Sequence, residues 1–267
     1  MSGSFVFNGF SSLDYGLRVG GVSSYAAPGR ELQTYYVPGR IGAVVPASDY
    51  GTIPNEIREY AAALYMRAHI NGYVENMMTL LRQRLLDVNG YAILTDSYEP
   101  NIYRRAFFTG DFVPTRKGAG QNFEIPIRFS CDPRRYIAGN HDFIIYGGSG
   151  TVTYTTPDTV SGFIIDDPAK PLIKISTGGN ATTITFTDDA TNAQIGQIIL
   201  AGGGSQLATD IWFDAETLNA TFVSDGSNAN TLISDVVGEI RLGPGSTRLS
   251  FNDPTVALSI TPRWWVR

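Results

Sequence analysis

Residues 172–200 read LIKISTGGNATTITFTDDATNAQIGQIIL and decide the fold class. The stretch contains three strand-length runs, Leu172–Ser176, Thr182–Thr187 and Gln194–Leu200. Turn-forming Gly, Asn and Asp residues separate the runs, and no helical spacing interrupts them. The pattern predicts consecutive β-strands joined by short turns.

The whole of residues 138–267 repeats this pattern. Its other strand-like runs are Asp142–Tyr146, Thr151–Thr155, Gly162–Ile165, Ile211–Asp214, Thr221–Ser224, Glu239–Leu242, Arg248–Phe251 and Val256–Thr261. Many short strands at this spacing, without a helix, predict a β-sandwich domain. Ala138–Asn140 is the expected boundary of this domain, since the composition shifts toward Thr, Ile, Gly, Asn and Asp beyond Tyr136.

Residues 1–137 are also rich in strand signals but contain one helix. The expected strands are Phe5–Phe7, Tyr15–Val22, Tyr91–Asp96, Tyr103–Thr109, Phe112–Thr115 and Phe123–Phe129, and 117–120 is an expected hairpin turn. Val74, Met77, Met78, Leu81 and Leu85 fall at helical spacing and predict a helix over about 73–88. The fold class is therefore mainly β with one α-helix.

Two segments of the first half are special. Residues 30–45 predict a hairpin or arm, because two strand-like runs, Leu32–Val37 and Ile41–Val45, flank Pro38-Gly39. Residues 56–70 fit either a helix, from their three consecutive alanines, or a strand, from their period-two alternation.

Composition and charge narrow the function classes. Of the 267 residues, residues 1–137 carry 14 Lys and Arg against 12 Asp and Glu, whereas residues 138–267 carry 6 against 13. Neither half has the strongly basic stripe that neutralises phosphates, so nucleic-acid binding is disfavoured. Seventeen arginines beside 14 tyrosines and 14 phenylalanines favour large protein–protein contacts.

No segment predicts membrane insertion or a cofactor site. The uncharged stretch 190–209 is interrupted by Asn, Gln and three consecutive glycines, so it cannot span a bilayer. The glycine-rich stretch 117–120 lacks the following helix and the Lys-Ser/Thr pair of a phosphate-binding loop.

For each candidate catalytic residue, a structural role explains the sequence better than a catalytic role. The two histidines, His69 and His141, have no Ser or Cys nucleophile motif beside them. The doublets Asp166-Asp167 and Asp188-Asp189 are expected in turns, where Asp bonds its own backbone. Cys131 is expected to be a small buried residue, and no zinc or calcium pattern is present. We therefore expect no enzymatic activity and no catalytic, cofactor-binding or metal-binding residues.

Trp212 and Trp265 are candidate glycan contacts, because the CH groups of a pyranose stack on an indole face. Tryptophan also fills sandwich cores, and this alternative stays open.

The order of several blocks resembles the distal tail protein family of long-tailed, non-contractile bacteriophages. In the first half the blocks are 5–9 (FVFNG), 15–19 (YGLRV), 37–42 (VPGRIG), 90–96 (GYAILTD), 103–106 (YRRA) and 127–136 (IRFSCDPRRY). In the second half they are 171–175 (PLIKI), 211–216 (IWFDAE), 242–247 (LGPGST) and 260–264 (ITPRW), which resemble the family's galectin-like C-terminal domain.

The resemblance implies a structural role in the virion. Residues 1–137 would be a ring-forming domain of β-barrel or sandwich type, and residues 138–267 a galectin-like sandwich that projects outward. The resemblance also favours the strand for residues 56–68 and an arm that reaches the neighbouring subunit. The arm residues expected between subunits are Leu32, Tyr35, Tyr36, Val37, Ile41 and Val44.

The implied assembly is a homo-hexameric ring at the distal end of the tail, made in the host cytoplasm. Its implied partners are the tail tube protein, the tail-associated or tip protein, and receptor-binding or baseplate proteins. Two other classes stay open: a tail-tube or tube-terminator protein, and a carbohydrate-binding sandwich that aids host adsorption.

Overall fold

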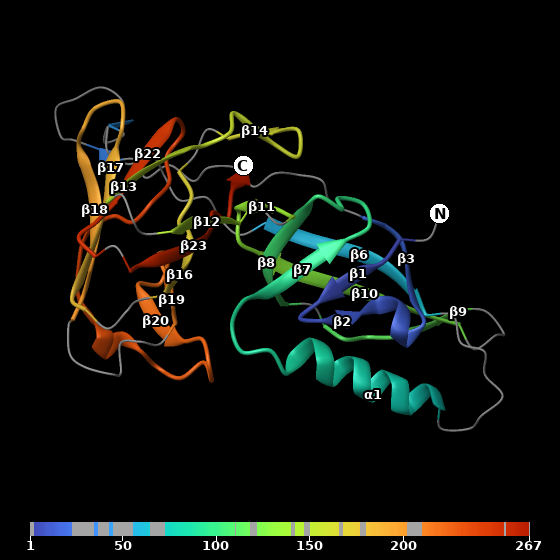
Figure 1. The fold of residues 1–267 in the computed structure, drawn as a ribbon. Coiled ribbons are helices and arrows are strands. Elements are labelled where there is room, and N and C mark those ends of the chain that lie inside the picture. Colours follow the sequence, from blue (N-terminus) through green and yellow to red (C-terminus); the bar gives the residue numbers. More distant parts are fainter. Residues whose placement is uncertain are drawn as a thin grey trace. The chain divides into compact units, whose positions relative to one another are not determined.

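The computed structural model describes most of the chain. The described residues are 3–22, 35–36, 43–44, 56–64, 73–109, 111–117, 122–139, 142–146, 150–165, 168–176, 180–201, 210–253 and 255–266. The fold divides into two compact units, Met1–Arg135 and Tyr136–Val266, which we describe separately (Figure 1).

The first unit is built on one antiparallel sheet. Its strands are β1 (Phe5–Phe7), β2 (Phe10–Ser11), β3 (Leu17–Val22), β6 (Glu56–Leu64), β7 (Ala92–Asp96), β8 (Ile102–Phe108), β9 (Thr115–Lys117) and β10 (Asn122–Cys131). Their order is β2-β1-β7-β8-β10-β6-β3, and β9 pairs with the outer part of β10. Gly3, just before β1, exchanges two backbone hydrogen bonds of 2.9 Å with Val19 of β3. This bridge links the β1–β2 end of the strand order to β3 at the other end, so the sheet closes on itself.

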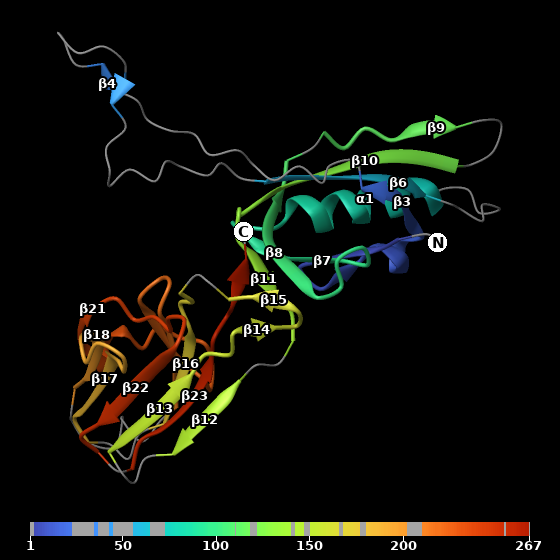
Figure 2. The same cartoon turned by 90° about the horizontal axis from the view of Figure 1, so that it is seen from above.

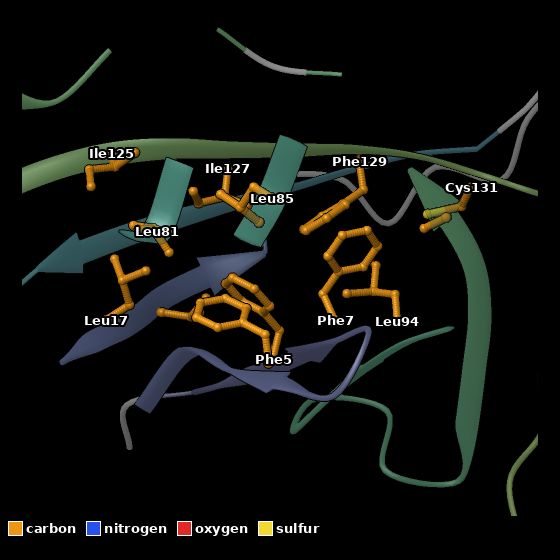
Figure 3. Packing of buried hydrophobic residues seen from close by; sticks show 13 residues of the cluster. Phe5, Phe7, Leu17, Leu81, Leu85, Leu94, Ile125, Ile127, Phe129 and Cys131 are labelled. Atoms are coloured by element: carbon orange, nitrogen blue, oxygen red, sulfur yellow. The ribbon is translucent and has the colours of Figure 1, made fainter. Parts of the chain in front are cut away.

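Helix α1 (Tyr73–Leu86) packs into the core of this unit. Leu81 and Leu85, at the expected helical spacing, are 1% and 2% exposed. Figure 3 shows them among Leu17 of β3 and Ile125 and Ile127 of β10. The aromatic part of the core is made by Phe5, Phe7 and Phe129, whose rings meet edge-on or tilted at 4.8–5.7 Å.

The structure answers the helix-or-strand ambiguity for residues 56–64, the described part of segment 56–70. Residues 56–64 are the strand β6, as the resemblance favoured, because they pair with β10 on one side and β3 on the other. The strand expected at Phe112–Thr115 is wrong, since the ladder with β10 covers Thr115–Lys117 instead. Pro114 explains the shift, because proline has no amide proton to donate to a ladder.

The second unit consists mainly of two five-stranded antiparallel sheets. One has the order β12 (Phe143–Tyr146), β23 (Ala257–Thr261), β16 (Leu172–Ser176), β19 (Ile211–Asp214) and β20 (Asn219–Phe222). The other has the order β13 (Thr151–Thr155), β22 (Ser246–Phe251), β17 (Thr182–Asp188), β18 (Gln194–Leu200) and β21 (Ile233–Gly238). A separate short pair is formed by β14 (Thr159–Val160) with β15 (Phe163–Ile164), whereas β11 (Arg135–Ile137) and β24 (Trp265–Val266) pair with each other within the ten-stranded sheet.

Alternating burial shows that the two sheets share one core. Ile173 and Ile175 of β16 are fully buried, as are Ile184 and Phe186 of β17 in the other sheet. Because successive side chains of a strand point to opposite faces, each sheet has one core face and one outer face. The sandwich predicted for the second half is confirmed.

The expected strand at Glu239–Leu242 is wrong, and the strand β21 lies just before it. Ile240 and Leu242 are fully buried, and the backbone of Leu242 exchanges two 2.9 Å hydrogen bonds with Ala169. The apolar side chains of this segment therefore alternate because they pack into the core, although the segment itself is not a strand. The strand expected at Thr221–Ser224 is shifted to β20, since its ladder with β19 runs from Asn219 to Phe222.

Gly238 ends β21 and should be hard to replace. Its φ of +73° lies in the left-handed region, and a Cβ would overlap the carbonyl oxygen of Ile195. We expect Gly238→Ala to lower the free energy of unfolding by about 3 kcal/mol, because the β18–β21 pairing must also shift. The matched control Gly226→Ala has φ +71° but open space around the added Cβ, so it should cost only about 1 kcal/mol. Urea unfolding followed by circular dichroism compares the two, and equal losses would contradict the steric explanation.

Candidate functional site

The structure places only some of the candidate catalytic residues. His69, His141, Asp166 and Asp167 lie outside the described residues. Cys131 is fully buried on β10, as expected.

The Asp188 turn is confirmed. Its Oδ1 accepts hydrogen bonds from the backbone N–H groups of Ala190 (2.9 Å) and Thr191 (3.1 Å). Asp189 accepts a hydrogen bond from Arg248 at 3.2 Å. These carboxylates therefore stabilise a turn and a neighbouring strand.

The described residues hold neither a metal cluster nor a membrane-spanning helix. They contain no cluster of three or more His, Cys, Asp or Glu side chains that could hold a metal ion. No helix among them has the length and apolar character needed to cross a bilayer.

The predicted arm contains a short ladder. Strand β4 (Tyr35–Tyr36) pairs antiparallel with β5 (Ala43–Val44), with Tyr35 opposite Val44. The chain enters this segment from β3 and leaves it into β6, and these two strands are themselves antiparallel neighbours. Figure 2 shows β6 beside β3, the two strands between which β4 and β5 lie in the sequence. Leu32, Val37 and Ile41 lie outside the described residues.

The outer face of β1, β7 and β8 carries unusually large apolar side chains. Val6, Tyr91 and Ile93 are 38%, 43% and 57% exposed. Val6 alternates with the buried Phe5 and Phe7, so it points away from the core.

Two side chains of β8 complete this surface. Phe107 meets the Tyr91 ring edge-on at 5.3 Å, and the Arg105 guanidinium lies 6.0 Å from the centre of the same ring. We call the set Val6, Tyr91, Ile93, Arg105 and Phe107 the β7 face. Tyr, Phe and Arg are the side chains that protein–protein interfaces favour.

An ion-pair network lies beneath the sheet, on its core side. Arg58 of β6 is 1% exposed and places Nη2 2.9 Å from Asp96 Oδ2 and 3.0 Å from Glu99 Oε2. Glu99 also pairs with Arg104 at 2.6 Å and with Arg135 at 2.9 Å. Asp96 Oδ1 accepts two backbone hydrogen bonds of 2.9 Å, from the N–H groups of Tyr98 and Glu99.

This network fixes β6, β7 and β8 to one another. Arg58 is the third residue of β6, the strand into which the arm segment returns. The network therefore ties the end of that connection to the core of the first unit.

Sequence reasoning missed this network, although a signal existed. Ile102, Arg104 and Ala106 alternate along β8 and are all buried, so Arg104 occupies a core-facing position of the strand. A charged residue at such a position needs a partner, because an unpaired buried charge is costly.

One further ion pair lies directly after β10. Arg134 donates to both carboxylate oxygens of Asp132, at 3.0 Å from Nε to Oδ1 and 2.8 Å from Nη2 to Oδ2. Burial of Asp132 opposes its ionisation, but these hydrogen bonds and the charge of Arg134 outweigh burial and hold its pKa below the usual value. The carboxylate is thus neutralised locally by its own neighbour.

The three tryptophans occupy different environments. Trp264 is 1% exposed and belongs to the core of the second unit. Trp265 is partly exposed, and its Nε1 donates a 3.3 Å hydrogen bond to the carbonyl of Pro168. Trp212 of β19 is partly exposed on the outer face of its sheet.

No known protein family matches the chain by its sequence, and no curated protein does. Solved structures do match. The SPP1 Dit protein, described as a paradigm of the hub adsorption apparatus in phages that infect Gram-positive bacteria, has a TM-score of 0.66 at 14% identity. The match covers 97% of this chain and 98% of that one. The chain has the fold of a phage hub protein.

Chains of the phage P2 baseplate in its activated conformation share this fold. The form with Ca matches with a TM-score of 0.56 at 10% identity, and the form with Sr with 0.57 at 11%. Each match covers 97% of both chains, so the likeness extends over both units.

Proposed function

We propose that this protein is a distal tail hub protein of a bacteriophage, whose copies form a closed ring between the tail tube and the baseplate or receptor-binding apparatus. The observation that carries this proposal is the β7 face. Its apolar and aromatic side chains point outward from a unit whose core is already filled by Leu81, Leu85 and the phenylalanine cluster. A second copy of the chain is the proposed cover for this face.

Ring formation follows from the kind of contact this face would make. When two different surfaces of identical subunits meet, each new copy presents the same free surface again. Such head-to-tail contacts close into a ring if the rotation between copies allows it. The likeness to a phage hub protein and to phage baseplate chains supports a role in such an assembly.

The arm is proposed to extend the contact between copies. A stable ring needs large interfaces, on the order of 2,000 Å² each, and a two-stranded arm adds area beyond a flat face. The β4–β5 ladder supports this role, because it keeps the two sides of the arm together.

The second unit favours a hub over a tail-tube protein. A tube protein needs only the ring domain, whereas this chain adds a complete two-sheet sandwich. Residues 138–267 carry the acidic excess of the chain, so they suit docking to another tail component, whereas the nearly balanced first half avoids charge accumulation around a ring. We propose six copies, with the tail tube protein on one side and tip, baseplate or receptor-binding proteins on the other, at the distal end of the virion tail.

The proposal predicts the mass of the purified protein. Light scattering coupled to size exclusion should give about six times the 29.0 kDa of the chain, and negative-stain microscopy should show closed rings. Monomers at every concentration, even with tail components added, would refute the ring. Long fibres of stacked rings would favour a tube protein instead.

Deletion of residues 32–45 tests the arm. We expect the shortened chain to stay folded, because both sheets of the sandwich and the core of the first unit lie outside the deletion. The ring should dissociate into smaller species in the low micromolar range, where the full chain remains assembled. A ring of unchanged mass at the same dilution would remove the arm from the interface.

A further inference from the structure

Trp212 lies in the middle of a polar row on the outer face of the second unit. Ile211 and Phe213, its neighbours on β19, are buried, so the indole points to the opposite side. Across the sheet Trp212 is opposite Lys174 of β16 on one side and Thr221 of β20 on the other. The indole is therefore framed by polar side chains on a flat, outward-facing sheet.

Two ion pairs flank the indole along its own strand. Lys174 Nζ lies 2.5 Å from Asp210, and Arg263 Nη2 lies 2.6 Å from Asp214. Asp210 and Asp214 are two residues before and after Trp212, so all three lie on the same face. Arg263 also donates a 2.8 Å hydrogen bond from Nε to the carbonyl of Lys170, which fixes its guanidinium.

Both carboxylates stay charged in this arrangement. The hydrogen bond from Lys174 lowers the pKa of Asp210 below its usual value. Burial raises the pKa of Asp214, but the hydrogen bonds and charge of Arg263 outweigh burial, and the net shift is downward. The two cations and two anions around Trp212 therefore cancel.

Polar side chains lie beside the ring. Among the described residues, none accepts a hydrogen bond from Trp212 Nε1, and none bonds the hydroxyl of Thr221. Lys174 uses one of its three N–H groups in its ion pair with Asp210. An apolar ring surrounded by unused donors and fixed ion pairs matches a pyranose, which has one CH-rich face and hydroxyls at its edge.

The geometry points to a saccharide-binding platform on the second unit, with Trp212 as the stacking surface and Lys174 and Thr221 as hydrogen-bonding side chains for the hydroxyls of a neutral hexopyranose. The net charge of the second unit disfavours anionic polymers. The two ion pairs beside Trp212 carry no net charge, whereas residues 138–267 as a whole carry seven more acidic than basic side chains. A polyanion such as a uronate or a phosphodiester polymer would be repelled. The platform is independent of the ring contact, because it uses none of the β7 face.

Affinity electrophoresis of the full chain tests this inference. Native gels that contain dextran, galactomannan or a neutral galactan should retard the protein, whereas a polygalacturonate gel should not. Trp212→Ala should weaken the retardation at least about ten-fold, and Thr221→Val by a smaller factor. Ile164→Ala removes another exposed side chain of the same unit, 65% exposed, and should migrate like the original chain. Circular dichroism checks folding, and Trp212→Leu replaces Trp212→Ala if the alanine variant fails to fold.

Several outcomes would overturn the platform. They are an absence of retardation in all neutral polymers, retardation in the anionic gel alone, and equal retardation of the original chain and the folded Trp212 variant. The mass of each variant, measured in parallel, keeps the two proposals apart. A ring without sugar binding refutes the platform alone, and a sugar-binding monomer refutes the ring alone.

Discussion

Replacing Arg58 by methionine should lower the free energy of unfolding of the first unit by about 3–5 kcal/mol, the usual cost of breaking one side of a buried ion pair. Arg58 is 1% exposed, and it donates from Nε and Nη2 to Asp96 Oδ2 at 3.3 and 2.9 Å. Methionine preserves most of the buried volume but leaves Asp96 without this guanidinium. The loss is therefore electrostatic rather than a packing defect.

Two further variants separate the network from general damage. Arg82→Met makes the same substitution at an exposed position of α1 and should change stability by less than about 0.5 kcal/mol. Arg58→Met combined with Asp96→Asn should be more stable than Arg58→Met alone, because a neutral amide then replaces the buried carboxylate. Urea unfolding of all variants gives the comparison. If the double variant is the less stable of the two, the charge of Asp96 is not what Arg58 compensates.

The network also explains why the first unit tolerates an apolar outer face. Arg58, Asp96 and Arg104 fix the three strands from the core side by charged hydrogen bonds, which are directional. The side chains of the β7 face are then not needed to hold the strands together, and they can bind a partner. This division of roles between the two sides of one sheet suits the ring subunit that we propose.

The fold could largely be predicted from the sequence because its signals are local. Strands such as β16, β17 and β18 each combine β-branched residues with turn residues at both ends, and the helix shows its apolar stripe within four turns. The failures occur where tertiary contacts override the local pattern. Ile240 and Leu242 alternate as in a strand, yet their alternation serves the core rather than a ladder.

The candidate site could be predicted from the sequence less completely than the fold. The β4–β5 ladder was predicted as a hairpin, because two apolar runs flanking Pro-Gly form a local signal, whereas the role of the arm between subunits stays a prediction. The β7 face was not, because both sides of β7 are apolar and only the register decides that Leu94 is buried and Ile93 exposed. The ion network joins residues up to 77 positions apart, and nothing in the linear order relates Arg58 to Arg135.

The largest functional effect is expected for Ile93→Glu, which should convert the proposed ring to monomers in the low micromolar range. Ile93 is 57% exposed at the centre of the β7 face, so the free subunit gains a glutamate without losing a core contact. Arg105 lies directly opposite and can pair with it, which protects the fold. In the assembled ring the same glutamate would be desolvated. The loss of a central contact costs about 2 kcal/mol or more, roughly thirty-fold in affinity, at every interface of the ring.

Ile144→Glu provides the matched control, because Ile144 of β12 is 59% exposed on the outer face of the second unit. Both substitutions place the same side chain on an exposed strand position, so general effects on solubility and charge are equal. Light scattering should find monomers for Ile93→Glu and intact rings for Ile144→Glu, with unchanged circular dichroism for both. Rings in both variants would show that the β7 face is not the contact, whereas monomers in both would assign the assembly to charge rather than to this face.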